Sequence, residues 1–181
     1  MVNPDYQSIM LPLLKFASDG KEHTINDAIE DIVKQFKLND EDKLEMLPSG
    51  RQRTIDNRVG WARTYLKKAG LFESTKRGHF KITKRGLNVL KEKPNQINIK
   101  YLEKFPEFNE FRAAKKEEIK ESEHLPQTPQ ETVEYGAQKL ENELVQDLLK
   151  SIKSCSPNFF EKLVVELLVK MGYGGTVKDA G

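Results

Sequence analysis

Apolar side chains recur at intervals of three or four residues along most of the chain, and this spacing predicts amphipathic helices. Pro12 lies inside the first of these stretches and predicts a kink, because proline removes a backbone hydrogen bond. Asn3 and Pro4 suit the cap and the first position of that helix. In the first half of the chain the pattern predicts helices at 4–17, 26–36, 54–69 and 84–90.

Two short strands are predicted between the third and fourth helices. The stretches 71–74 and 79–82 flank Thr-Lys-Arg-Gly, and a glycine-containing turn of this length between two strands predicts a hairpin. A further extended piece is expected at 22–24. The resulting order is helix, strand, helix, helix, strand, strand, helix, which is typical of a winged helix. In that fold the third helix enters the major groove of DNA, and the hairpin, or wing, contacts the neighbouring backbone or minor groove.

The pattern changes after Pro94. Residues 94–134 contain four prolines, few aliphatic side chains and a mixed-charge run, which indicates a linker with at most a short helix at 107–121. Helical spacing resumes in two stretches, 135–153 and 157–171. We therefore expect a mainly α fold with a small β-hairpin (α+β), divided into a winged-helix domain (1–93), a linker (94–134) and a helical region (135–181).

Composition excludes several classes of protein. No stretch approaches the roughly 18 apolar residues of a membrane span, and the N-terminus lacks the pattern of a signal peptide. The single cysteine, Cys155, allows no internal disulfide, so a cytoplasmic location is expected. The three histidines are too scattered for a zinc site, so no metal or cofactor is expected in this chain.

The net charge of +2 conceals a strong asymmetry. Residues 1–50 carry 5 Lys/Arg and 10 Asp/Glu, residues 51–93 carry 13 and 3, and residues 94–181 carry 12 and 15, giving net charges of −5, +10 and −3. Such a concentration of positive charge indicates a polyanionic partner, and nucleic acid before a membrane surface.

The basic segment coincides with the predicted third helix and wing, and it supplies the candidate DNA-binding residues. Arg and Asn suit contacts with guanine and adenine edges, whereas Lys and Arg on the wing suit phosphates. Basic residues on a helix are often only a solvated surface, and winged helices can also bind protein. Trp61 flanks the apolar stripe and is expected in the core. The candidates are Arg51, Gln52, Arg53, Thr54, Asn57, Arg58, Arg63, Lys67, Lys76, Arg77, His79 and Lys81.

Four segments also resemble the Mrr family of bacterial restriction endonucleases: "PDYQSIMLPLLKFASDG", "NRVGWARTYLKKAGLFES", "RGHFKITKRGLNVL" and "FFEKLVVELLVKMGYGG". The resemblance extends over nearly the whole chain except the linker. It implies an N-terminal winged helix joined to a PD-(D/E)xK nuclease domain, in an enzyme that cleaves foreign DNA with modified, commonly methylated, bases.

In that family, the nuclease carboxylates hold a divalent metal, and Mg²⁺ is expected for the intact enzyme. The motif should follow the last residues of this sequence, so the helical region is expected to open a truncated α/β nuclease domain, and the chain should bind DNA without cutting it. Asp179 is not nominated, because the family's catalytic Asp lies farther on. Glu161 is a candidate accessory residue at the metal site, or only a first-turn carboxylate favoured by the helix dipole.

Two other functions remain open at the level of sequence. One is a winged-helix transcription regulator dimerised through its C-terminal helices. The other is a winged helix that mainly binds protein and restrains a nuclease partner. A homodimer or higher homo-oligomer is expected in the nuclease reading, because cleavage of both strands needs two active sites. Double-stranded DNA is the expected partner.

Overall fold

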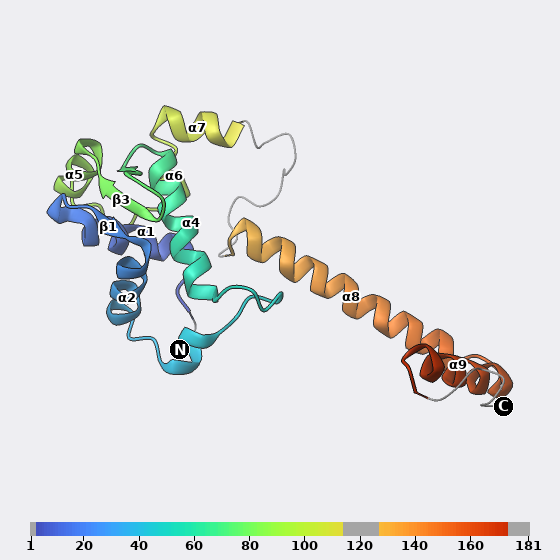
Figure 1. Cartoon of the computed structure of the whole chain (residues 1–181). Coiled ribbons are helices and arrows are strands. Elements are labelled where there is room, and N and C mark those ends of the chain that lie inside the picture. Colours follow the sequence, from blue (N-terminus) through green and yellow to red (C-terminus); the bar gives the residue numbers. More distant parts are fainter. Residues whose placement is uncertain (1–2, 114–126, 174–181) are drawn as a thin grey trace. The chain divides into compact units, whose positions relative to one another are not determined.

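The computed structural model describes residues 3–113 and 127–173, and these form a mainly helical chain with one small antiparallel sheet (Figure 1). The chain divides into two compact units, Met1–Glu134 and Tyr135–Gly181. Within the described residues, the expected order of helices and strands is present, with a further short helix, Asp40–Leu44, between the second and third predicted helices. The helices are α1 (Tyr6–Phe16), α2 (Ile25–Gln35), α3 (Asp40–Leu44), α4 (Thr54–Lys68), α5 (Lys84–Lys91), α6 (Ile99–Leu102), α7 (Pro106–Ala113), α8 (Pro129–Lys153) and α9 (Pro157–Lys170), with a 3-10 turn at Ala17–Asp19.

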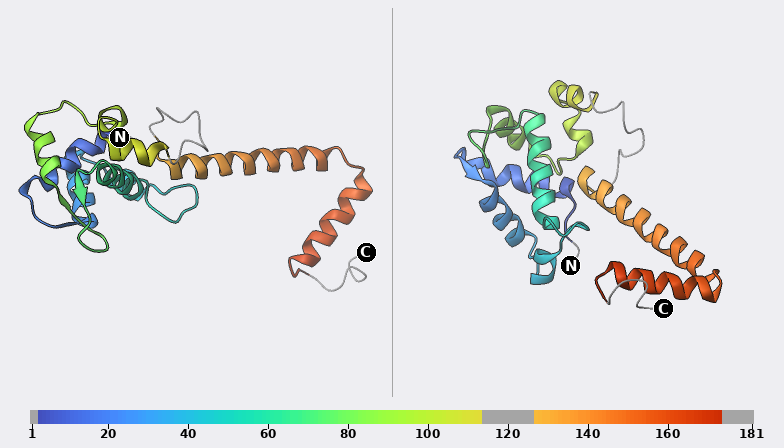
Figure 2. Two further views of the ribbon diagram at one scale, coloured as in Figure 1. Left: turned by 90° about the horizontal axis from the view of Figure 1, so that it is seen from above. Right: turned by 45° about the vertical axis from the view of Figure 1, so that its right-hand side comes forward.

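The core of the first unit is built where α1, α2 and α4 meet (Figure 2). Their apolar stripes are almost fully buried, as the helical spacing predicted. Pro12 lies inside α1, as the sequence indicated. The predicted cap of that helix was wrong, because Asp5 is the N-cap and accepts hydrogen bonds from the backbone of Gln7 and Ser8. Asn3 is buried instead, and its amide donates to the backbone oxygen of Asp42 at 2.8 Å.

The sheet has the strand order β1-β3-β2, with β1 at His23–Thr24, β2 at Phe72–Glu73 and β3 at His79–Ile82. Both pairs are antiparallel. The outer strands are short, and β3 buries alternate residues, Phe80 and Ile82, against the core. The connection between β2 and β3, residues 74–78, is about as long as the predicted turn.

Part of the predicted linker folds into the first unit. Helices α6 and α7 lie within 94–134, and Ile99, Leu102 and Phe108 are buried in the same core as α1 and α4. The ring of Phe108 packs edge-on against Tyr65 of α4, with centroids 5.7 Å apart. The segment was predicted to be a linker because prolines and charged residues outnumber the few aromatic side chains that pack against the core. The remainder of the predicted helix at 107–121, residues 114–121, lies outside the described residues.

The second unit consists of most of α8 and the whole of α9. Ser156 caps α9 by accepting a hydrogen bond from the backbone of Phe159, and Pro157 stands in the first turn. The apolar side chains of both helices are largely exposed. No described helix is long and apolar enough to cross a membrane.

Candidate nucleic-acid interface

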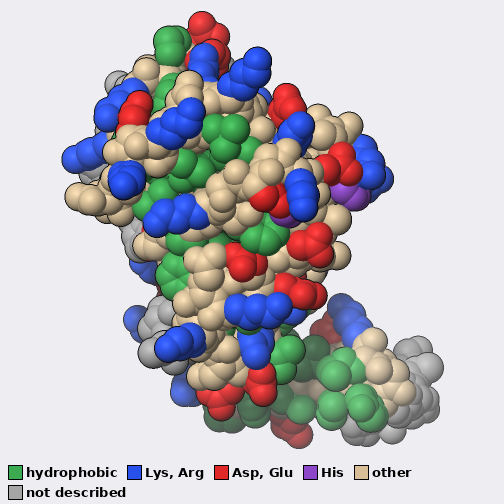
Figure 3. Space-filling model, turned by 90° about the vertical axis from the view of Figure 1, so that its left-hand side faces the viewer, with side chains coloured by type: hydrophobic (Ala, Val, Ile, Leu, Met, Phe, Trp, Pro, Cys, Tyr) green, Lys and Arg blue, Asp and Glu red, His purple; other side chains and the backbone are tan. Residues whose placement is uncertain are grey.

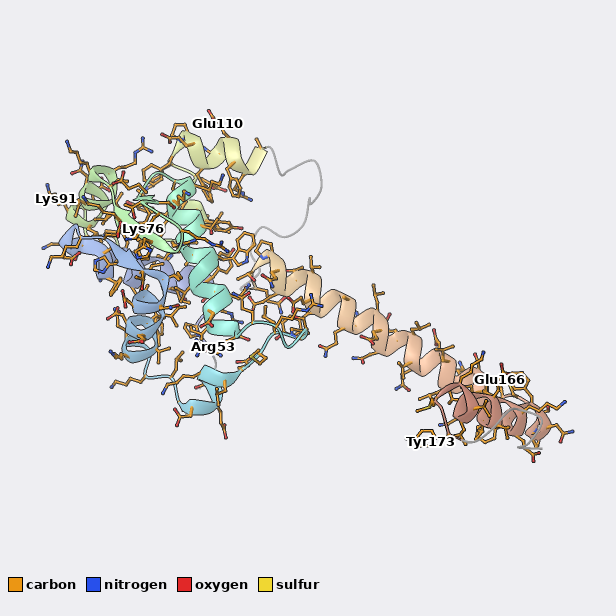
Figure 4. All side chains as sticks on the ribbon, viewed as in Figure 1. Arg53, Lys76, Lys91, Glu110, Glu166 and Tyr173 are labelled. Atoms are coloured by element: carbon orange, nitrogen blue, oxygen red, sulfur yellow. The ribbon has the colours of Figure 1, made fainter. Side chains whose placement is uncertain are left out.

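Helix α4 presents one side to the core and another to solvent. Val59 and Leu66 are fully buried on the inner side. Because a helix repeats every 3.6 residues, Arg53, Asn57 and Thr64 share the opposite side. Lys67 extends this outer stripe and is exposed, and Arg53 lies exposed at the start of the helix (Figure 4). The outer stripe is the part of α4 that could enter a DNA groove.

The loop before α4 is a small hairpin of its own. Met46 and Arg53 form an isolated antiparallel bridge, and the backbone of Leu47 donates to the oxygen of Gln52 at 2.9 Å. Gly50 adopts a φ of 66°, a left-handed conformation that glycine tolerates well. The loop holds Arg51 exposed near the tip and places Arg53, at its end, within 2.8 Å of Asp56.

Three of the predicted DNA-binding residues are not available in this conformation. Thr54 is fully buried, and Asn57 is only 2% exposed although it belongs to the outer stripe. The side chain of Arg58 is 13% exposed, and its guanidinium is occupied by contacts inside the first unit. Helical phase alone placed Asn57 and Arg58 outside, because the sequence did not show that another segment covers them.

The covering segment is residues 128–134, which we call the docking segment. Its Glu131 is fully buried and pairs with Arg58, whose Nη2 and Nε lie 2.7 and 3.0 Å from the same carboxylate oxygen. The remaining nitrogen of Arg58 donates to the backbone oxygens of Asn3 and Pro4 at 2.7 and 3.1 Å. The guanidinium therefore ties the N-terminal segment, α4 and the docking segment together.

The polar groups of Asn57 are satisfied by the same segment. The hydroxyl of Thr128 donates to the amide oxygen of Asn57 at 2.6 Å, and the amide nitrogen donates to the Gln130 side chain at 2.7 Å. A weaker contact at 3.2 Å runs from that nitrogen to Gln52. Thr128 also caps α8, because its hydroxyl accepts from the backbone of Glu131 at 3.1 Å. The first turn of α8 is thereby fixed to the first half of α4.

The docking segment also reaches the loop before α4. A carboxylate oxygen of Glu134 accepts a hydrogen bond from the backbone of Ser49 at 3.1 Å. The hydrogen bond from Gln130 has the largest effect on the pKa of Glu134 and lowers it below its usual value, and hydrogen bonds from Ser49 lower it further. Glu134 is therefore ionised at neutral pH.

The hairpin between β2 and β3, which is the predicted wing, carries the remaining predicted basic residues. Lys76 and Arg77 are exposed in its turn. Lys76, which is labelled in Figure 4, pairs with Glu22 at 2.9 Å. The Nδ1 of His79 lies 3.0 Å from the backbone oxygen of Arg77, and this oxygen accepts the hydrogen bond. Lys81 is half-buried on β3 opposite Glu73. The hairpin thus presents two exposed cations, Lys76 and Arg77, in its turn. His79 and Lys81 lie along β3.

Two further cations lie near the candidate surface. Lys68 is exposed at the end of α4 and lies 4.8 Å above the ring of Phe111, a cation–π contact. Lys84 is exposed at the start of α5. Arg63 is half-buried on α4, and burial lowers the pKa of its guanidinium without removing its charge at neutral pH. Lys68 and Lys84 contribute to the net charge of residues 51–93, but they were not among the predicted DNA-binding residues.

Charge of one sign does not cover every face of the molecule. On the face in Figure 3, Lys and Arg side chains are interspersed with Asp and Glu. The candidate surface contains fewer residues than the basic segment as a whole, because several of the predicted residues are buried or half-buried. Its exposed members among the predicted residues are Arg51, Arg53, Lys67, Lys76 and Arg77.

Glu161 has no metal-binding surroundings within the described residues. It is exposed, and no group of three or more His, Cys, Asp or Glu side chains that could hold a metal occurs in 3–113 and 127–173. Those residues therefore do not fit a magnesium site. The first-turn explanation was wrong, because Glu161 is the fifth residue of α9, beyond a first turn that contains no acidic residue. The accessory role of Glu161 in an intact nuclease stays a prediction. Asp179 lies outside the described residues.

Comparison with known proteins confirms the resemblance drawn from the sequence. Residues 6–92 match the Mrr N-terminal domain. The chain is 25% identical to the type IV methyl-directed restriction enzyme EcoKMrr of Escherichia coli (strain K12) over 193 residues, which cover 99% of this chain. It spans 62% of the length of that relative. No solved structure matches the chain.

Proposed function

We propose that this Mrr-like chain, whose residues 6–92 match the Mrr N-terminal domain, is the DNA-targeting part of a restriction endonuclease that cleaves foreign, methylated DNA. The observation that carries the proposal is its similarity to a methyl-directed restriction enzyme over 99% of its length. That similarity favours a restriction role over a transcription regulator. We assign DNA binding to the first unit and a cytoplasmic location to the protein.

The order of elements and the sheet order β1-β3-β2 support a winged-helix arrangement for this unit. In such a fold, α4 takes the groove and the hairpin between β2 and β3 lies along the backbone. The exposed cations Arg53 and Lys67 on α4 and Arg77 on the wing suit these two positions. The net charge of +10 over residues 51–93 supplies the electrostatic attraction to phosphates.

Cleavage is proposed for the intact enzyme with Mg²⁺, which would activate water and stabilise charge at the scissile phosphate. We assign no catalytic step to the described residues, because they do not fit a magnesium site. The exposed apolar faces of α8 and α9 support a homo-oligomer. Light scattering coupled to gel filtration tests this, and a monomer at micromolar concentration would count against it.

The test of DNA binding is fluorescence anisotropy with one duplex, methylated and unmethylated, across a salt series. Lys67→Ala and Arg77→Ala should weaken binding and each reduce the salt slope by about one. Lys150→Ala, which removes an exposed charge from the second unit, is the matched control and should change little. A preference for the methylated duplex would place target selection in this chain, whereas the absence of salt-sensitive binding would contradict the proposal.

A further inference from the structure

The docking segment offers Asn57 the hydrogen-bonding pattern of a base edge. Thr128 donates to the amide oxygen at 2.6 Å, and Gln130 accepts from the amide nitrogen at 2.7 Å. In the major groove, adenine presents the same pair, because its N6 amino group donates and its N7 accepts. One donor and one acceptor are thus provided side by side to an asparagine that belongs to the outer stripe of α4.

The same segment offers Arg58 the pattern of a phosphate. The fork of a guanidinium matches the oxygens of a carboxylate and of a phosphate alike. Here one carboxylate oxygen of Glu131 accepts from two N–H groups of Arg58 at 2.7 and 3.0 Å, as a single phosphate oxygen could. A second carboxylate, that of Glu134, accepts from the backbone of Ser49 in the loop before α4, as a phosphate oxygen could. An acidic, polar segment therefore satisfies groups that suit DNA.

We propose that the docking segment is an intramolecular stand-in for DNA on the first half of α4, and that DNA displaces it so that Asn57 can read an adenine edge. This inference rests on the proposed DNA binding and adds a specificity residue and a competitor to it. Asn57 belongs to the outer stripe and is 2% exposed, and two of its three side-chain partners come from the docking segment. Release of the segment would free the amide for a base.

The first test is hydrogen exchange of the wild-type chain with and without a saturating duplex of mixed sequence. The backbone N–H groups of Glu131 and Thr132 are bonded within the docking segment. Displacement predicts that their exchange accelerates roughly tenfold when DNA binds, while residues 140–150 of α8 exchange as before. Unchanged or slower exchange in 128–134 would mean that the segment is a permanent brace, and would overturn the proposal.

Two variants test the competition by affinity. Thr128→Val removes the hydroxyl without changing charge and should tighten DNA binding roughly fivefold. Glu131→Gln weakens the pair with Arg58 and should tighten DNA binding by at least about tenfold. Glu141→Gln removes the same charge from an exposed position of α8 and should stay within about twofold of the wild type. Circular dichroism and a thermal melt confirm that each protein is folded.

The outcomes separate this inference from the proposed function. Wild-type binding that is salt-sensitive, with no gain in Thr128→Val or Glu131→Gln, leaves DNA binding intact and overturns the stand-in. Absence of binding in the wild type and in both folded variants overturns both. The proposal is supported if both variants bind DNA more tightly and the gain is larger on duplexes rich in adenine. Adding Asn57→Ala to the Thr128→Val protein should then remove the gain in affinity, which supports the role of Asn57.

Discussion

Replacing Glu131 by alanine should strongly destabilise the first unit. The substitution removes a fully buried carboxylate that accepts two hydrogen bonds from Arg58 and one, at 2.7 Å, from the backbone of Thr128. Breaking a buried ion pair by removing one partner costs about 3–5 kcal/mol, because the other charge is left uncompensated. Arg58 keeps its bonds to the oxygens of Asn3 and Pro4, so we expect the lower end, about 3 kcal/mol.

The measurement is urea unfolding followed by circular dichroism, together with a thermal melt. A loss of about 3 kcal/mol corresponds to a fall in Tm of roughly 10 °C for a unit of this size. A double-mutant cycle with Arg58→Met isolates the pair and should give a coupling of at least about 1.5 kcal/mol. A loss below about 1 kcal/mol would refute the view that Glu131 and Arg58 form a buried ion pair. So would a double variant whose loss of stability equals the sum of the two single losses.

Further substitutions test the packing of the first unit and the role of the predicted linker. Gly86→Ala should destabilise by about 2 kcal/mol, because the added Cβ would lie 2.5 Å from the backbone oxygen of Leu71 and 2.6 Å from the side chain of Ile82. Gly136→Ala in α8 meets no neighbouring atom within 4 Å and should instead stabilise its helix by up to about 1 kcal/mol, so equal effects in urea unfolding would contradict this reading. Phe108→Ala should cost about 3–5 kcal/mol, since the ring is fully buried, and a neutral result in a melt would remove α7 from the core.

The helices of the first unit could be predicted because their apolar stripes are regular. Ile55, Val59 and Leu66 follow the spacing of a buried face, and the structure buries all three. The hairpin was equally predictable from its glycine-containing turn. Trp61 was expected in the core; it is half-buried, packed against the core and edge-on to Tyr65.

The covered side of α4 could not be predicted in the same way. Burial of Asn57 and Arg58 depends on residues that are 71–73 positions away in the sequence, and no local spacing reports such a contact. The segment that covers them reads as a linker, because its contribution is polar rather than apolar. A Thr followed three residues later by a Glu, ahead of a long helix, is a capping-box signal that could have marked its start.

The same reasoning explains why the linker appeared longer than it is. Ile97, Ile99 and Leu102 are each buried, but they stand among prolines and charges. Three apolar residues over six positions give too short a pattern to define a helix against that background. Their burial depends on the surface that α1 and α4 provide, which only the folded unit contains.

The central claim is that the first unit binds DNA through the exposed cations of α4 and the wing. The most direct test is the anisotropy of a labelled duplex titrated with the wild-type chain and with Lys67→Ala/Arg77→Ala at several salt concentrations. We predict binding whose logarithmic salt slope falls by about two in the double variant. Binding that is unaffected by salt and by both substitutions, or no binding at all, would contradict the claim.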